Sequence, residues 1–302
     1  MQFQIKRDKL LKSLSVAHNI IEKKNTLPIL SNVLLEAKNK ILNVVATDLD
    51  LVFHEEIDDV KIQQEGSTTT SATVLFDLLR KLPSNLDVDF DLQSENKLKI
   101  SAKNSKFNLL CLPVGNFPNF AHNFQTKPFS LENKKFLSLL NKAKISMSND
   151  DTRHYLNGIF IHVTASNKGT YLTGVATDTH RLSSSSIPIK EAENFKPFIL
   201  PKKSVYQLCT LLQESDENIL LYIGDTKIQF EIGKSKIVSK VIDGKFPEYN
   251  KVVPKNNNKT LNVSVKDFVN SVERVITVSI DRKEGVKLTL DKDNIQLFVN
   301  SS

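Results

Sequence analysis

The segment whose residue types are best suited to catalysis or binding is Asp178-Thr179-His180-Arg181. In it, a carboxylate and an imidazole stand two positions apart. Such a pair could serve in catalysis, with His180 as a general base. However, no nucleophile with a supporting group stands nearby in the sequence. The matching segment earlier in the chain, ATDLDLV at 46–52, also lacks both the histidine and the arginine. We therefore favour surface recognition by His180 and Arg181 over catalysis.

Other catalytic and metal-binding patterns are missing from the sequence. It contains no glycine-rich phosphate loop, no GxSxG elbow, no HExxH segment and no paired Cys/His ligand set. Cys111 and Cys209 lie in apolar surroundings and match no metal or redox spacing, which favours two reduced, buried thiols. We expect no catalytic residue, no metal and no cofactor.

The charge balance points toward an anionic partner. The 302 residues carry a formal net charge of +7, and the sequence pI is about 9.1, which makes nucleic acid the first candidate. A lysine-rich composition also arises from AT-rich coding sequence, so charge alone leaves nucleic-acid binding open. No apolar run is long enough for a membrane span, and the N-terminus lacks the apolar stretch of a signal peptide. We expect a cytoplasmic protein without a membrane partner.

The chain nearly repeats itself twice. Segments 1–14, 127–140 and 259–272 each read as a short alternating strand, a charged turn and an amphipathic helix. The first two copies stay in register much further, so that Pro118 in NFPNF answers Pro247 in KFPEY. A period of about 130 residues is the size of a whole small domain and is too long for a solenoid unit.

Apolar spacing predicts two helices in each of the first two copies. The longer helices are predicted at 8–24 and near 133–147, and the shorter ones at 73–81 and 202–212. Alternating or short apolar runs predict strands at 33–37, 41–46, 87–92, 97–102, 106–110, 158–163, 171–176, 219–223, 227–232 and 236–241. Each copy is then an α+β domain of two helices packed on roughly eight mostly antiparallel strands. Basic residues recur on equivalent helices, which could form a positive track for phosphates without base readout.

Five segments together resemble a known family. They are TLPILSN at 26–32, ATDLDL at 46–51, RHYLNG at 153–158, ATDTHRL at 176–182 and VIDGKFPEYNKVVP at 241–254. In this order and register they are similar to the bacterial DNA polymerase III β subunit, the sliding clamp, throughout the chain. The family carries three copies of one domain of this size, which agrees with the repeat. We therefore expect tandem clamp domains at 1–125 and 126–256 and a partial, truncated third domain at 257–302.

The resemblance implies a processivity factor for DNA replication. In the family, two subunits pair head to tail into a ring that encircles duplex DNA without sequence preference and tethers the replicative polymerase. The implied partners are double-stranded DNA, the DNA polymerase III α subunit, the clamp loader δ subunit, other proteins with clamp-binding motifs, and a second copy of the chain. The implied role is an accessory subunit of the DNA-directed DNA polymerase holoenzyme without catalytic activity of its own. The alternative is a peptide-binding module that docks such motifs without encircling DNA.

Site residues follow from the resemblance position by position. The expected DNA-facing residues are Lys24, Arg80, Arg153, Tyr155 and Lys203. The expected pocket for a short apolar, glutamine-containing partner peptide consists of Leu156, Thr177, His180, Arg181, Leu182, Pro247, Lys251 and Val252. The pocket lies mainly on the second domain, near its border with the third, with its leucines, Pro247 and Val252 as an apolar cleft.

The subunit interface implied by the resemblance uses Lys97, Lys106, Phe107 and Leu109 of the first domain and Arg274, Thr277 and Val278 of the third. The family's third domain continues for about 80 residues past the position of Ser302 and supplies the opposing side of that interface. We therefore expect Phe107 and Leu109 to form an exposed apolar edge. For the 302-residue chain, a monomer or aggregate is expected in place of a closed dimer.

Overall fold

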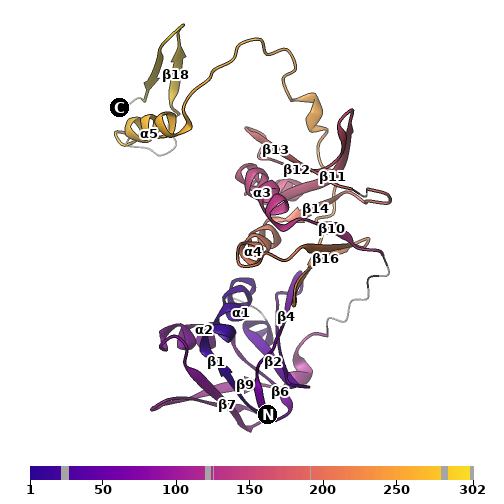
Figure 1. Ribbon diagram of the computed structural model, residues 1–302, viewed down its shortest axis with the longest axis vertical. Helices are drawn as coiled ribbons and strands as arrows, with labels where there is room; N and C mark the ends of the chain where they lie inside the picture. The colour runs from indigo at the N-terminus through magenta and orange to yellow at the C-terminus, as the bar shows by residue number, and fades with distance from the viewer. Residues whose placement is uncertain (22–26, 120–123, 125, 191, 280–284, 300–302) are drawn as a thin grey trace. The chain divides into compact units, whose positions relative to one another are not determined.

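The computed structural model describes residues 1–302 except 22–26, 120–123, 125, 191, 280–284 and 300–302 (Figure 1). It consists of two compact units, Met1–Phe246 and Pro247–Ser302. The first unit contains the first copy and most of the second, and the second unit contains the last residues of the second copy and the start of the third. Among the described residues, no helix has the length and apolar character that a membrane crossing requires.

The first copy is built from two α-helices and a curved run of antiparallel strands. Its helices are α1 (Arg7–Ile20) and α2 (Ala72–Lys81), with a short 3₁₀ helix at Pro28–Ser31 and another at Val114–Asn116. Its strands are β1 (Gln2–Lys6), β2 (Asn32–Lys38), β3 (Ile41–Thr47), β4 (Leu51–Ile57), β5 (Lys61–Gln64), β6 (Gly66–Ser71), β7 (Asp87–Ser94), β8 (Lys97–Ala102) and β9 (Ser105–Leu112).

The second copy repeats this plan. Its helices are α3 (Asn133–Ala143) and α4 (Lys202–Gln213), with 3₁₀ helices at Lys144–Ser146 and Asp151–Leu156. Its strands are β10 (Phe129–Leu131), β11 (Gly158–Ser166), β12 (Gly169–Thr177), β13 (Leu182–Pro188), β14 (Phe198–Pro201), β15 (Ile219–Ile223), β16 (Lys227–Ile232) and β17 (Ser235–Lys240). The predicted α+β class, with two helices on antiparallel sheet in each copy, is confirmed.

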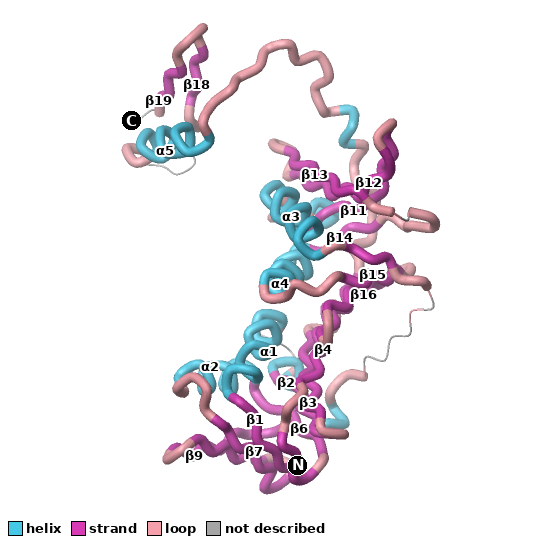
Figure 2. The backbone as a smooth tube through the Cα atoms, viewed as in Figure 1, coloured by secondary structure: helices cyan, strands magenta, loops and turns pink. Residues whose placement is uncertain are grey.

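The two copies are joined by one continuous sheet. Strand β17 of the second copy pairs with β4 of the first, with Ile237 opposite Phe53. The thirteen-stranded sheet therefore runs β10-β15-β16-β17-β4-β3-β2-β6-β9-β8-β7-β1-β5, and β13-β12-β11-β14 form a separate four-stranded sheet. Figure 2 shows the helices of both copies on one side of this unit, with β4, β15 and β16 on the other. A ladder of backbone hydrogen bonds across the junction makes the copies a single structural body.

The helices cover the sheet with the apolar stripes that their spacing predicts. In α1, Leu10, Leu14, Ala17 and Ile20 are completely buried, whereas Lys9 and Lys12 face solvent. In α3, Phe136, Leu139 and Leu140 are buried and Leu137 is partly covered. Both helices thus separate an apolar face from a basic one.

The third copy begins differently from the other two. The predicted strand around Leu261 and Val263 is wrong, because the structure assigns no regular secondary structure to residues 259–264. In the first two copies the same segment pairs with a neighbour, as β1 does with β7 and β10 with β15. No strand of the described chain pairs with residues 259–264, and an isolated strand lacks the hydrogen bonds that would hold it. The second unit contains a 3₁₀ helix at Tyr249–Lys251, α5 (Val265–Ile276), β18 (Lys287–Leu290) and β19 (Ile295–Phe298).

Candidate functional site

The turn between β12 and β13 contains Asp178, His180 and Arg181. The Asp178 Oδ1 atom accepts hydrogen bonds from the backbone N–H groups of His180 and Arg181, both at 3.0 Å. The Thr177 hydroxyl accepts from the Thr179 N–H at 3.1 Å and donates to the Arg181 carbonyl at 2.8 Å. These bonds close the turn and hold Thr179 in the left-handed region, with φ of 78°.

The carboxylate of Asp178 acts as a fixed acceptor in this turn. Partial burial works to raise its pKa, but the backbone hydrogen bonds of Arg181 and His180, followed by the Arg181 guanidinium, outweigh burial and lower it. The second carboxylate oxygen accepts from Arg181 Nε at 3.0 Å. Asp178 thus contacts the backbone of His180, and the two side chains do not form the Asp–His pair of a catalytic site. The turn instead exposes His180 and Arg181 to solvent.

The other two expected pocket residues of the first unit are leucines in different surroundings. Leu156 ends the 3₁₀ helix Asp151–Leu156 and is only 1% exposed, so it belongs to the core beneath the surface. Leu182 lies opposite Thr177 in the β12–β13 ladder and is half-buried. Nearby, Phe160 stacks on Phe246 with ring centroids 5.0 Å apart and planes 9° from parallel. A stacked pair of aromatic side chains therefore lies near the turn.

Three expected pocket residues belong to the second unit. Pro247 is exposed, and Lys251 pairs with Glu248 one helical turn earlier. Val252 is 71% exposed, which is high for a branched apolar side chain. An exposed apolar residue next to a lysine is a feature that a partner surface can use.

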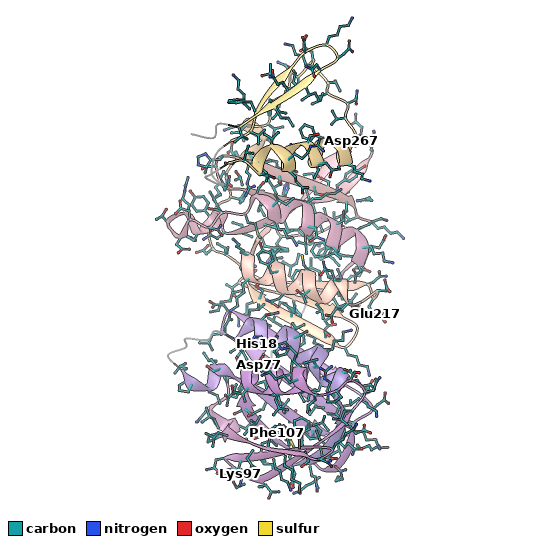
Figure 3. All side chains as sticks on the ribbon, turned by 90° about the vertical axis from the view of Figure 1, so that its left-hand side faces the viewer. His18, Asp77, Lys97, Phe107, Glu217 and Asp267 are labelled. Atoms are coloured by element: carbon teal, nitrogen blue, oxygen red, sulfur yellow. The ribbon has the colours of Figure 1, made fainter. Side chains whose placement is uncertain are left out.

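The expected DNA-facing residues are held by local ion pairs. On α2, Arg80 pairs with Asp77 at 2.9 Å and lies over the Phe76 ring at 5.5 Å. Figure 3 shows Asp77 near His18 of α1, on the face where the helices of this copy lie. In the second copy, Arg153 pairs with Asp150 at 2.7 Å. The Thr152 side chain, and then that of Arg153, lower the pKa of Asp150 to about 2.

The remaining DNA-facing residues lie in different surroundings. Tyr155 is half-buried beside His154, with ring centroids 5.9 Å apart. Lys203, at the start of α4, reaches across to the first copy and pairs with Asp48 at 2.5 Å. Lys24 lies outside the described residues. The described basic residues predicted by position are therefore spread over both copies, and Lys203 forms an ion pair across the junction between them.

The expected subunit-interface residues of the first copy lie on β8 and β9 (Figure 3). Lys97 and Lys106 are exposed as expected. The expectation of an exposed edge formed by Phe107 and Leu109 needs correction, because both side chains pack against the core and are half-buried. Strand alternation points them inward and turns Leu110 outward, where it is 83% exposed. Leu110 is thus the exposed apolar side chain of this strand.

The interface residues expected from the third copy lie at the end of α5. Arg274 donates to the Ser271 hydroxyl at 2.9 Å, and the Thr277 hydroxyl donates to the Glu273 carbonyl at 2.8 Å. Val278, just past the helix, is 62% exposed.

Sequence reasoning missed a set of ion pairs that joins the two copies. Lys203, Lys234 and Lys240 of the second copy pair with Asp48, Asp58 and Asp50 of the first, and Lys12 of α1 pairs with Glu214. We call these residues the junction pairs. The repeat contained one signal for them, because Asp48 occupies the same turn position in the first copy as Asp178 does in the second.

Two models of known protein domains match most of this chain. Residues 1–121 match the model of the DNA polymerase III beta subunit N-terminal domain, and residues 130–248 match that of its central domain. The chain belongs to the DNA polymerase III beta subunit family.

Individual sliding clamps agree with this assignment along the whole chain. The chain is 35% identical over 305 residues to the beta sliding clamp of Caulobacter vibrioides and 31% identical over 301 residues to that of Escherichia coli. Each alignment covers 100% of this chain and 81% of the relative. A solved clamp structure from C. crescentus superposes with a TM-score of 0.93 at 35% identity, covering 99% of this chain and 80% of that one. A clamp from Bartonella birtlesii bound to griselimycin gives a TM-score of 0.91 at 35% identity, covering 98% and 80%.

The described geometry of the Asp178 turn leaves the side chains of His180 and Arg181 exposed to solvent. Among the described residues, no cluster of His, Cys, Asp and Glu is arranged to hold a metal ion.

Proposed function

We propose that this chain is a DNA polymerase processivity factor, a sliding clamp subunit that encircles duplex DNA and tethers clamp-binding proteins to it. The observation that carries the proposal is the continuous sheet through β17 and β4, with the helices of both copies on one side. This arrangement suits one arc of a ring whose strands form the wall and whose helices face the enclosed duplex. We propose domain boundaries at 1–125, 126–256 and 257–302, and a ring made by head-to-tail pairing of two subunits.

Sliding requires contacts that are numerous but individually weak. Arg80 and Arg153 are already paired with neighbouring carboxylates. Because the carboxylate offsets part of the positive charge, each arginine attracts a phosphate more weakly. Phosphate contacts of this kind are screened by salt and carry no sequence information. We propose that Arg80, Arg153, Lys24 and Lys203 contribute positive charge around the DNA and that Tyr155 also faces it, and that topological linkage, not affinity, keeps the ring in place.

We propose that partner peptides bind beside the Asp178 turn. The exposed His180 and Arg181 would orient a polar group of the peptide, while Leu182, Pro247 and Val252 would contact its apolar side chains. Partners of this class are the polymerase α subunit, the clamp loader δ subunit and other proteins with clamp-binding motifs. A replication factor of this kind acts on the bacterial chromosome and hence in the cytoplasm.

The test is topological. The chain is labelled with a fluorophore and incubated with a clamp loader, ATP and nicked circular DNA, and protein that co-elutes with DNA is measured by gel filtration. We expect retention on the circle and release when a restriction enzyme linearises it. Retention that is equal on circular and linear DNA would refute encirclement. Failure to load, combined with retained peptide binding that His180→Ala weakens, would favour a peptide-docking module instead.

A further inference from the structure

Strand β10 forms one edge of the thirteen-stranded sheet, and the structure leaves that edge open. On one side β10 pairs with β15, with Leu131 opposite Ile219. Among the described residues, no strand pairs with its other side. The open side of an edge strand presents backbone N–H and C=O groups without ladder partners, so that it is a template for another strand.

The first copy shows what occupies the equivalent edge. Strand β1 corresponds to β10, because the repeat aligns Phe3 with Phe129 and Ile5 with Leu131. One side of β1 pairs with β7, as β10 pairs with β15, but its other side pairs with β5, where Ile62 lies opposite Phe3. Phe3 is only 1% exposed. The fold therefore accommodates an added antiparallel strand at this position.

The second copy lacks a counterpart of β5. Between β13 and β14, the described residues of the segment 189–197 form no strand. Phe195 of this segment meets Phe129 edge-on, with ring centroids 5.1 Å apart. Phe129 is nevertheless only half-buried, whereas its counterpart Phe3 is covered. The second copy thus keeps the edge strand and lacks the strand that covers it in the first.

A cavity of about 610 Å³ follows the open side of β10. The consecutive residues 128–132 all line it, and no residue of β15 does. Its apolar wall is formed by Leu172, Ile187 and Phe195. We call this space the β10 groove. Its volume lies within the range of about 300–1,000 Å³ that is typical of ligand pockets, and its course along five consecutive residues suits an extended chain.

The rim of the β10 groove is positively charged on balance. Of the described residues that line it, Lys127, Lys135 and Lys190 are basic and exposed, and Glu132 is acidic. Lys135 pairs with Glu132 at 2.6 Å, whereas no carboxylate of the described residues pairs with Lys190. The exposure of these side chains shows that the groove opens to solvent, and their charge favours an occupant with acidic side chains.

We propose that the β10 groove binds an extended, acidic segment of a partner protein, which adds to β10 as an antiparallel strand. An apolar side chain of that segment lies against Phe129, as Ile62 lies opposite Phe3 in the first copy. Its acidic side chains face Lys135 and Lys190 at the rim. Main-chain hydrogen bonds supply the affinity in such strand addition, and the alternating side chains supply the selectivity. The occupant follows from β5 of this chain and from the charge of the groove, independently of the proposed function.

Peptide binding and hydrogen exchange test this site together. The full chain is titrated with the fluorescein-labelled pentapeptide Glu-Val-Glu-Ile-Glu, whose apolar side chains alternate with acidic ones, and binding is followed by fluorescence anisotropy. Amide hydrogen exchange is then measured by mass spectrometry with and without saturating peptide. We expect saturable binding and slower exchange of the backbone amides at 129–131, because strand addition gives the open side of β10 hydrogen-bond partners.

Matched variants place the peptide in the groove. Lys190→Glu reverses one exposed charge at the rim and should weaken binding about fivefold at low salt. Lys168→Glu makes the same change at an exposed turn outside the groove and should leave binding unchanged. His180→Ala should also leave it unchanged, which separates this site from the peptide pocket proposed at the Asp178 turn. The peptide Glu-Gly-Glu-Gly-Glu, which keeps the charges and lacks the apolar side chains, should bind at least fivefold more weakly than the original.

The remaining outcomes overturn the proposal. Absence of binding, binding without slower exchange at 129–131, or equal binding by Lys190→Glu would each remove the strand-addition site. A short DNA duplex that displaces the peptide and itself slows exchange at 129–131 would assign the groove to nucleic acid instead. Each of these results leaves the proposed function standing, because that function is tested separately by retention on circular DNA.

Discussion

The ion pair between Lys203 and Asp48 should stabilise the junction between the two copies. Asp48→Asn removes the negative charge but keeps Oδ1, which accepts from the backbone N–H groups of Asp50 and Leu51 at 3.0 and 2.7 Å. The turn should therefore survive the substitution. Lys203→Met removes the positive charge and keeps an apolar stem of similar length. The pair of variants isolates the charge interaction with little change of shape.

The geometry sets the size of the expected effect. At the observed 2.5 Å, two unit charges attract by about 7 kcal/mol at an effective dielectric constant of about 20, and by about 1.7 kcal/mol in water. The Asp48 side chain is 7% exposed and that of Lys203 is 32% exposed, so the pair lies between these limits. Dehydration of both groups and ordering of the lysine chain offset much of the attraction. We expect a coupling free energy of about 2 kcal/mol and a cost of about 2–3 kcal/mol for each single substitution.

The assay is a double-mutant cycle on urea unfolding, combined with DNA retention on nicked circles as a function of salt. If Lys203 serves mainly the junction, the double variant should be little less stable than either single variant. A coupling free energy below about 0.5 kcal/mol would refute the junction role. Unchanged stability in Lys203→Met, with a salt slope of DNA retention reduced by about 0.9, would instead assign Lys203 to a phosphate contact.

Three further predictions concern other parts of the molecule. Gly158→Ala would place a Cβ 2.2 Å from the Leu200 carbonyl oxygen, and in urea unfolding it should destabilise the fold by about 3 kcal/mol. The control is Gly115→Ala, because Gly115 has open space around it. That variant should change the free energy of unfolding by less than about 0.5 kcal/mol. Burial lowers the pKa of His54 from 6.5, so the unfolded chain binds more protons at this residue than the folded chain does. The free energy of unfolding should therefore fall as the pH drops below about 6.5, and His54→Gln should reduce this pH dependence. A pH dependence that His54→Gln leaves unchanged would contradict the lowered pKa of His54. Arg153→Ala should weaken DNA retention and reduce its salt slope by about 0.9, and an unaltered slope would remove Arg153 from the DNA-facing surface.

The local elements of this fold were largely predictable because they depend on short-range patterns. Apolar spacing in α1 and α3 identified the faces that pack on the sheet, and alternation located most strands to within a few residues. Where an element needs a distant partner, the same patterns were insufficient. The segment at 259–264 alternates as β1 and β10 do, yet it forms no strand without a neighbour to pair with.

In the candidate site, too, residue position predicted part of the arrangement and contacts between distant residues decided the rest. Position in the family motif selected Leu156 and Leu182 equally, but the structure buries Leu156 in the core and leaves Leu182 partly accessible. The sequence also grouped Lys203 with the basic helix residues, because residue type alone does not show which acid a lysine can reach. Its partner, Asp48, lies 155 positions away in the chain.

The sequence by itself determined the repeat, the two helices of each copy, the turn signature shared by Asp48 and Asp178, and the family. These features depend on residue order and spacing, which the chain carries in any conformation. Only the tertiary structure decided how the copies join through β17 and β4 and which charges meet across that junction. Those outcomes depend on contacts between residues far apart in the chain, and packing in three dimensions brings them together.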